Sequence, residues 1–170
     1  MMLITDLEFI ARQAAEKADD YEAFRYYIEL DERSDEALDE LVEQIATPII
    51  AAIDCTTCAN CCRHLDVYLT EADAQRLSSG TFIPYSTLLH QYIDREHAAQ
   101  VEEWGMFQQK PCVFLKDTLC SIYEYRPESC RIYPMFTPDF RWTLEDTFGG
   151  IGLCPIIYNV IEQLKIQLGW

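Results

Sequence analysis

The chain has 170 residues, of which 49% are hydrophobic and 25% are charged, a composition typical of a soluble globular protein. Its formal net charge is −16, and residues 1–54 alone carry 15 acidic and 4 basic side chains. A surface with this much negative charge repels phosphate backbones and anionic membrane surfaces. We therefore expect neither nucleic acid nor a membrane as a partner. The length suits one compact core, and we predict a single domain over residues 1–170.

The first residues, Met-Met-Leu-Ile-Thr-Asp, lack the basic and long apolar regions of a signal peptide. No apolar run approaches the ~20 residues that cross a bilayer. We therefore expect a cytoplasmic protein, in which thiols are kept reduced. Eight cysteines in that compartment favour metal binding over disulfides.

Residues 1–54 are predicted to form an acidic helical hairpin. Apolar residues recur at helical spacing over residues 5–30, with a break expected where Asp20 caps a second short helix. Ser34 is a good N-cap for the next helix, and Pro48 predicts a kink or a break inside it. The acidic faces are most simply a solvated surface; the alternative is that a protein partner docks on these helices.

Four cysteines then fall within eight residues, spaced C-x2-C-x2-C-C: Cys55, Cys58, Cys61 and Cys62. Residues three apart lie on the same side of a helical turn, so their thiolates can meet at one metal ion. A continuing helix would bring Cys55, Cys58 and Cys62 together with Cys61 at the edge, whereas tight turns would let all four converge. Both arrangements stay open. Because adjacent side chains diverge, we expect Cys61 or Cys62 to face thiols from further along the chain.

The region between the two groups of cysteines is predicted to hold a short extended segment and two helices. Thr70 and Asp73 form a weak capping box for a helix that ends at Gly80. Ser86 is expected to open a second helix that runs to about Trp104. Its two histidines are more simply ordinary surface or core residues than metal ligands, because thiols are already plentiful.

The remaining cysteines are dispersed: Cys112, Cys120, Cys130 and Cys154. Residues 113–115 and 119–123 predict two short strands that place Cys112 and Cys120 on opposite sides of a hairpin. Pro127 is expected at the first position of a short helix, whose dipole would stabilise a Cys130 thiolate. The glycine-rich residues 148–154 predict a loop close to a metal site, and a terminal helix follows.

Three arginines lie near cysteines in the sequence: Arg63, Arg126 and Arg131. Four thiolates around a zinc ion leave a net negative charge, which nearby guanidinium groups can offset through hydrogen bonds to the sulfurs. The alternative for each arginine is an exposed side chain with no such role.

The order of the motifs resembles a known family. C-x2-C-x2-C-C-R, P-C-x-F-L, C-S-I-Y-E-x-R-P-x-x-C-R-x-Y-P and C-P together look like the CxxCxxCC cysteine-cluster family over residues 55–155. Its members are described as zinc- or iron-chelating proteins, and a similar cysteine pattern occurs in flagellin lysine methylases. Ala59 stands where many members have glycine, and residues 1–50 fall outside the match. The resemblance implies the metal ligands Cys55, Cys58, Cys61, Cys62, Cys112, Cys120, Cys130 and Cys154.

The sequence therefore predicts a mainly α, small α+β fold. In it an N-terminal helical hairpin (1–54) packs on a cysteine-rich metal-binding core (55–155) with at most a short β-hairpin, and a C-terminal helix (156–170) follows. The predicted function is binding of zinc, or of iron, through two cysteine quartets. The alternative is an iron–sulfur redox protein or enzyme, one that could modify a protein partner, because C-x2-C-x2-C with a distant Cys-Pro resembles a ferredoxin ligand set. No catalytic residue is assigned.

Overall fold

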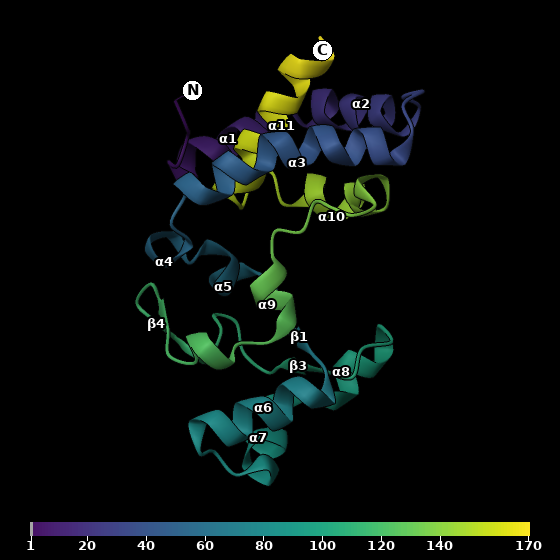
Figure 1. Cartoon of the computed structure of the whole chain (residues 1–170). Coiled ribbons are helices and arrows are strands. Elements are labelled where there is room, and N and C mark those ends of the chain that lie inside the picture. The colour runs from purple at the N-terminus through teal and green to yellow at the C-terminus, as the bar shows by residue number, and fades with distance from the viewer. Residues whose placement is uncertain (1) are drawn as a thin grey trace. The chain divides into compact units, whose positions relative to one another are not determined.

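The computed structural model describes residues 2–170 and consists mainly of helices with two small antiparallel sheets (Figure 1). The predicted fold class, mainly α with minor β structure, is confirmed. The chain forms two compact units, unit 1 from the residues up to Asp54 together with Pro134–Trp170, and unit 2 from Cys55–Tyr133. The single domain over residues 1–170 stays a prediction. None of the helices in residues 2–170 combines the length and the apolar character that crossing a membrane requires.

The elements of unit 1 are α1 (Leu7–Glu16), α2 (Ala18–Glu29), α3 (Asp35–Ala52), the 3-10 helix η2 (Phe140–Thr143), α10 (Leu144–Gly149) and α11 (Pro155–Leu168). Those of unit 2 are α4 (Cys55–Cys58), α5 (Asn60–His64), β1 (Tyr68–Leu69), α6 (Glu71–Thr81), α7 (Tyr85–Gln91), β2 (Ile93–Asp94), α8 (Arg95–Gln100), β3 (Gly105–Phe107), β4 (Leu115–Lys116), β5 (Leu119–Cys120), the 3-10 helix η1 (Tyr123–Tyr125) and α9 (Glu128–Ile132).

The first two helices break at Lys17, slightly earlier than predicted. Asp6 caps α1 by accepting the backbone N–H groups of Glu8 and Phe9. The sequence predicted that Asp20 caps α2, and this is wrong. Asp20 lies in the first turn of that helix and pairs with Lys165 of α11. A cation from α11 therefore offsets the carboxylate and lowers its pKa.

The third helix is capped as predicted and is not broken by its proline. Ser34 Oγ accepts the Ala37 N–H at 3.2 Å, and α3 then continues through Pro48 to Ala52. The predicted break does not occur because a stripe of buried side chains holds the helix on both sides of Thr47, while Pro48 itself faces solvent. That stripe consists of Leu38, Val42, Ile45, Ala46 and Ile49.

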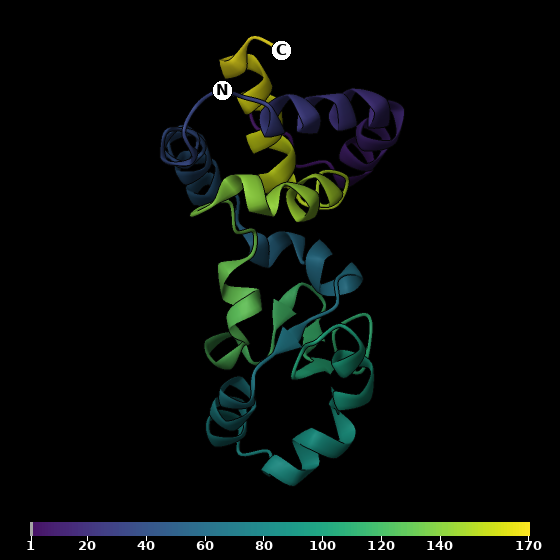
Figure 2. The same ribbon diagram turned by 90° about the vertical axis from the view of Figure 1, so that its right-hand side faces the viewer.

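The main partner of α3 is α11, drawn in yellow in Figures 1 and 2. Helix α2 packs against α10, and α1 packs against α2 and α11. The expected N-terminal hairpin thus shares its core with the C-terminal segment of the chain. The glycine-rich loop has a packing explanation too: a Cβ on Gly152 would lie 3.0 Å from Cβ of Ala14 in α1, so glycine lets the loop approach that helix.

Unit 2 contains a three-stranded sheet, in the order β1-β3-β2, that was not predicted. Ile93 of β2 pairs with Phe107 of β3, and Asp94 then caps α8. The prediction of a single helix from Ser86 to Trp104 is therefore wrong. Helix α7 ends at Gln91, and β2 and then α8 follow it. Strands of two or three residues are too short to leave a periodic signal in the sequence.

The capping box at the start of α6 is confirmed, but the helix runs through Gly80 to Thr81. Gly80 is required by packing rather than by chain reversal, because a Cβ there would lie 2.2 Å from the ring of Tyr125 in η1. The core of unit 2 comprises Leu69, Ala74, Leu77, Leu88, Ile93, Phe107, Phe114 and Ile122.

Arg141 of η2 holds the connection between α2 and α3. Its guanidinium donates to the carboxylate of Asp35 at 2.6 Å and to a row of backbone carbonyls, those of Ile28, Glu29, Asp31 and Arg33. The Ile28 carbonyl also accepts the backbone N–H groups of Leu30 and Asp31, so the Arg141 bond adds to the backbone bonds that end α2. One side chain therefore connects η2 to four successive parts of this turn.

We expect Arg141→Gln to lower the free energy of unfolding by about 2–3 kcal/mol, because a largely buried guanidinium that bonds one carboxylate and four carbonyls is lost. Arg33→Gln is the matched control in the same turn; it removes one pair, with Asp31, from a half-exposed arginine, and we expect a loss of no more than about 1 kcal/mol. Urea denaturation followed by circular dichroism measures both. Equal effects of the two substitutions would contradict this role for Arg141.

Candidate metal centre

The first four cysteines lie on two short helices, an arrangement between the two that the sequence left open. Helix α4 ends at Cys58, and α5 begins at Asn60. Between them Ala59 has the left-handed backbone conformation, with φ 52° and ψ 19°, and is buried. Its N–H donates to the Cys55 carbonyl at 3.0 Å and closes α4. The chain therefore reverses inside the motif, at the residue where many relatives are expected to have glycine.

A backbone hydrogen bond brings the two groups of cysteines together. The N–H of Cys112 donates to the carbonyl of Cys62 at 2.8 Å. The predicted hairpin follows, shorter than expected: Leu115 of β4 pairs with Cys120 of β5, so Cys112 precedes the first strand. Cys112 and Cys120 both pack against the core of unit 2, and α4 contacts β5. These thiols are therefore held by packed elements of the fold.

Arg63 ties the first cysteine helices to the tip of this hairpin. Its guanidinium donates to the Cys58 carbonyl at 2.8 Å and to the Asp117 carbonyl at 2.9 Å. Asp117 is in the left-handed conformation, with φ 57°, at the turn between β4 and β5. Arg63 thus orders the backbone of the site.

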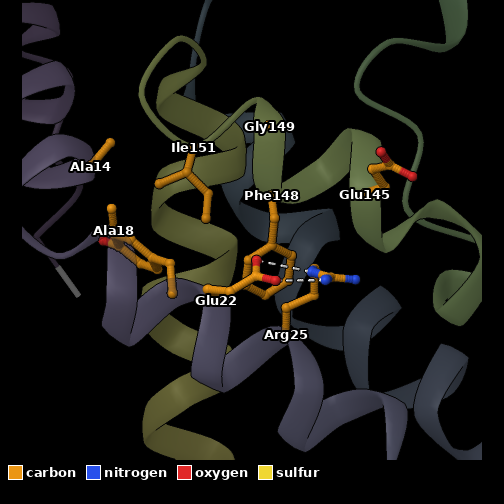
Figure 3. A pocket seen from close by; sticks show the side chains of 9 residues that line it. Ala14, Ala18, Glu22, Arg25, Glu145, Phe148, Gly149 and Ile151 are labelled. Atoms are coloured by element: carbon orange, nitrogen blue, oxygen red, sulfur yellow. Dashed lines mark hydrogen bonds and ion pairs between the residues drawn. The ribbon is translucent and has the colours of Figure 1, made fainter.

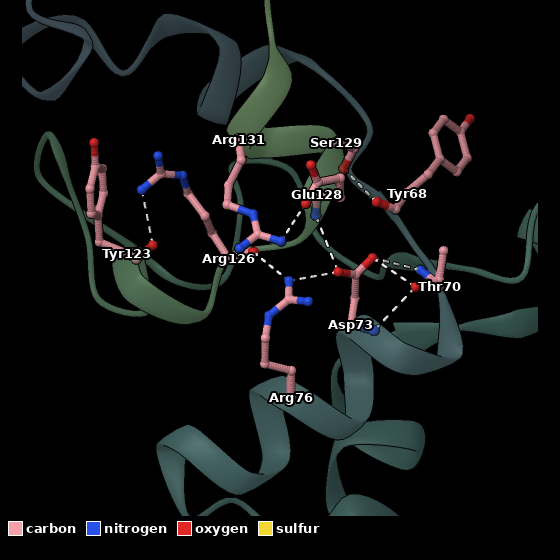
Figure 4. A network of polar contacts seen from close by, with 9 residues as sticks. All are labelled: Tyr68, Thr70, Asp73, Arg76, Tyr123, Arg126, Glu128, Ser129 and Arg131. Atoms are coloured by element: carbon pink, nitrogen blue, oxygen red, sulfur yellow. Dashed lines mark hydrogen bonds and ion pairs between the residues drawn. The ribbon is translucent and has the colours of Figure 1, made fainter.

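Cys130 is brought to the site by α9. Its N–H donates to the carbonyl of Pro127, which precedes the helix as its N-cap, one position before the predicted one. The neighbouring Ser129 Oγ donates to the Tyr68 carbonyl of β1 at 2.6 Å (Figure 4). Helix α9 is thereby attached to the central sheet of unit 2.

Four thiols from separate segments influence one another electrostatically, and we call them the thiol cluster: Cys62, Cys112, Cys120 and Cys130. Contact with Cys61, with Sγ atoms 4.0 Å apart, and the positive charges of Arg63 and Arg126 outweigh burial and lower the pKa of Cys62 to about 6. Burial raises the pKa of Cys112 and of Cys120, and the charge of Cys62 raises both further. One thiolate therefore stands among thiols that resist ionisation.

The expected effect of the helix dipole on Cys130 is wrong. Burial, and then the charges of the other three cluster residues, raise the pKa of Cys130 to about 12. A helix of five residues has a small dipole, and desolvation of a thiolate outweighs it. A thiolate at Cys130 would therefore lie near the negative charges of the other cluster residues.

The three arginines contribute differently. The charges of Arg63 and Arg126 both lower the pKa of Cys62. The Arg126 guanidinium lies 3.7 Å from the ring centroid of Tyr123 and donates to that residue's carbonyl at 3.0 Å. Arg131 pairs instead with Glu128 on its own helix (Figure 4). Cationic support for the cluster therefore comes from two of the three.

The other four cysteines are not part of the thiol cluster. Cys55, Cys58 and Cys61 lie on α4 and α5 of unit 2, whereas Cys154 belongs to unit 1, where it is buried directly before α11. Over residues 2–170 no three His, Cys, Asp or Glu side chains already converge as they would around a bound ion. The ligand role of these four cysteines stays a prediction.

The donor chemistry of the thiol cluster fits a zinc or iron ion. Zinc takes four thiolates in tetrahedral sites, and its ligands must lose their protons to bind it. A divalent cation would offset both the burial and the charge of Cys62 that hold the other three thiols protonated. The two nearby arginines offset the negative charge of the fully ionised set.

Unit 1 has a surface hollow of about 520 Å³ beside α2 and α10 (Figure 3). Its lining includes Phe148 and three charged residues, of which Glu22 and Arg25 pair with each other at 2.7 Å and Glu145 is the third. No thiol is among its lining residues. The hollow therefore lacks the metal-binding thiols that the cysteine region of unit 2 contains.

Comparison with known proteins supports the sequence resemblance. The family model CxxCxxCC, described as "Putative zinc- or iron-chelating domain", matches residues 54–147, more than half of the chain. The match includes seven of the eight cysteines and ends before Cys154. No curated protein and no solved structure matches the chain.

We expect Ala59→Gly to raise the free energy of unfolding by up to about 1 kcal/mol, because glycine adopts the left-handed conformation without the steric cost that a Cβ imposes. Ala74→Gly is the matched control: this alanine is equally buried but lies inside α6, where glycine costs about 1 kcal/mol. Chemical denaturation of both variants gives the sign. A loss of stability in Ala59→Gly would contradict the strained turn.

Proposed function

Because the chain belongs to the CxxCxxCC family, we propose that it binds zinc through the thiol cluster and that the ion stabilises the fold of unit 2. Metal chelation, of zinc or of iron, is the function that the family description gives. The choice of zinc and of these four ligands is our proposal. The ligand role of the other four cysteines, Cys55, Cys58, Cys61 and Cys154, stays a prediction.

One observation supports this ligand set above others: four thiols from α5, from the loop before β4, from β5 and from α9 act on one another's ionisation. The first quartet contributes Cys62 to this group, and the second contributes Cys112, Cys120 and Cys130. Such an arrangement agrees with the expectation that one of the adjacent cysteines faces thiols from later in the chain. When bound, zinc would hold together segments that are far apart in sequence.

The iron–sulfur alternative rests on Cys55, Cys58 and Cys61, whose spacing resembles part of a ferredoxin ligand set. The break at Ala59 places Cys55 and Cys58 on one helix and Cys61 on the next. This local turn is compatible with a cluster as well as with a single ion. Composition of the purified protein distinguishes them.

We expect protein purified without oxygen to be colourless and to contain at least one equivalent of zinc per chain. Elemental analysis, a visible spectrum and an assay for acid-labile sulfide test this together. Brown protein that contains sulfide and iron in place of zinc would overturn the proposal in favour of the iron–sulfur alternative.

We further expect metal and fold to be linked, because structural zinc can contribute on the order of 10 kcal/mol, as much as the stability of a whole domain. Cys130→Ser should lower the melting temperature of the zinc-loaded protein clearly. The same substitution should change the melting temperature little in excess chelator, where wild type and variant both lack metal.

Thermal melts by circular dichroism, with and without chelator, give this comparison. An unchanged cooperative melt of the wild type after metal removal would contradict a structural role for the ion. A Cys154→Ser variant in the same series is the matched control, and we expect it to keep its zinc equivalent because the four proposed ligands are those of the thiol cluster.

A further inference from the structure

Among residues 2–170 Asp73 is the only charged residue that is buried as a whole, with 3% of its surface exposed. Burying a carboxylate is costly unless hydrogen bonds and a cation compensate it. A helix cap does not require such burial, since Asp94 caps α8 of the same unit while partly exposed. The position of Asp73 therefore suggests a role beyond capping α6.

The two carboxylate oxygens of Asp73 serve two helices (Figure 4). Oδ2 accepts the N–H of Thr70 at 3.0 Å and its hydroxyl at 2.9 Å, which completes the capping box of α6. Oδ1 accepts the Arg76 guanidinium at 2.7 Å and the N–H of Glu128 at 3.2 Å. Glu128 is the first residue of α9, 55 residues further along the chain.

Arg76 extends this connection. The nitrogen Nη2 that donates to Asp73 also donates to the Arg126 carbonyl at 3.0 Å. The pair Asp73–Arg76 thus contacts the carbonyl before Pro127 and the N–H after it. The first turn of α9 is held from both sides, and Cys130 follows two residues after Glu128.

We propose that Asp73 is a positioning residue of the metal centre: together with Arg76 it fixes the start of α9 and hence the place from which Cys130 presents its sulfur. This inference rests on the proposed function, that the thiol cluster binds zinc. Residues that orient metal ligands without touching the ion typically change metal affinity by ~10–100-fold when replaced. Asp73 would act through the backbone of α9, since no contact with the sulfur is needed.

The test compares zinc affinities of full-length variants by competition with a chromogenic chelator. We expect Asp73→Ala to weaken zinc binding by roughly 10-fold or more. Thr70→Ala removes the hydroxyl from the α6 cap and leaves the bond to Glu128, and Asp94→Ala removes the cap of α8, which carries no cysteine. Both controls should bind zinc within about twofold of the wild type, because neither holds α9.

Two further readouts separate positioning from general loss of stability. In zinc-loaded Asp73→Ala, alkylation mapped by mass spectrometry should label Cys130 faster, while Cys112 and Cys120 stay protected. In the metal-free protein, amide hydrogen exchange should increase in α9 (Glu128–Ile132) and not in α8. If Asp73→Ala does not fold, Arg76→Gln keeps the capping box and loses the bond to Arg126, and we expect the same changes to a smaller extent.

Wild-type affinity in Asp73→Ala, or equal losses in Thr70→Ala and Asp94→Ala, would overturn the inference while the zinc-binding function stands. Absence of thiolate-bound metal in the wild type would instead overturn the proposed function, and the positioning role with it. The two failures are distinguished by the wild-type measurement alone. Loss confined to Asp73→Ala, with faster labelling of Cys130, is the expected result.

Discussion

The burial of thiols that must lose their protons to bind a metal ion is the constraint on which unit 2 depends. Burial first, and then the charge of Cys62, keep Cys112, Cys120 and Cys130 protonated. Hydrogen bonds of the surrounding structure fix the segments that carry these thiols. The Cys112 N–H bonds the Cys62 carbonyl, Arg63 bonds α4 to the hairpin tip, and Ser129 bonds α9 to β1.

The polar contacts around α9 differ in how deeply they are buried. Asp73 is fully enclosed and has four hydrogen-bond donors, whereas Arg131 and Glu128 pair in a more exposed position. Exposed pairs contribute little to stability, while an enclosed, fully bonded carboxylate fixes geometry. Order in the cysteine region is therefore determined more by a few enclosed groups than by the number of surface charges.

Sequence reasoning was most successful where the signal is local. Ser34 as an N-cap, the Thr70–Asp73 box and the helix that begins at Pro155 all depend on residues within one turn, and all three are present. The long helix from Ser86 was wrong because β2 exists only through its pairing with β3, which no local pattern reveals.

The same distinction applies to the site. The eight cysteines could be named from spacing and resemblance, but the second partner of Asp73, 55 residues away, could not. Its capping-box spacing is visible in the sequence, but a local spacing carries no information about a partner that only the tertiary fold brings near. The direction of the pKa shift of Cys130 was wrong for a related reason. A helix dipole follows from local structure, whereas the burial that raises this pKa depends on the whole tertiary fold.

The path of the chain through the two units affects how the protein is made. Unit 2 is one uninterrupted stretch, so all of it has been synthesised once Tyr133 is added, whereas unit 1 lacks α10 and α11 until residues 134–170 follow. At about 5–20 residues per second these 37 residues take on the order of 2–7 s. During this interval the apolar stripe of α3 has no α11 to cover it. The nascent chain is thus able to complete its cysteine region before the core of its N-terminal helices.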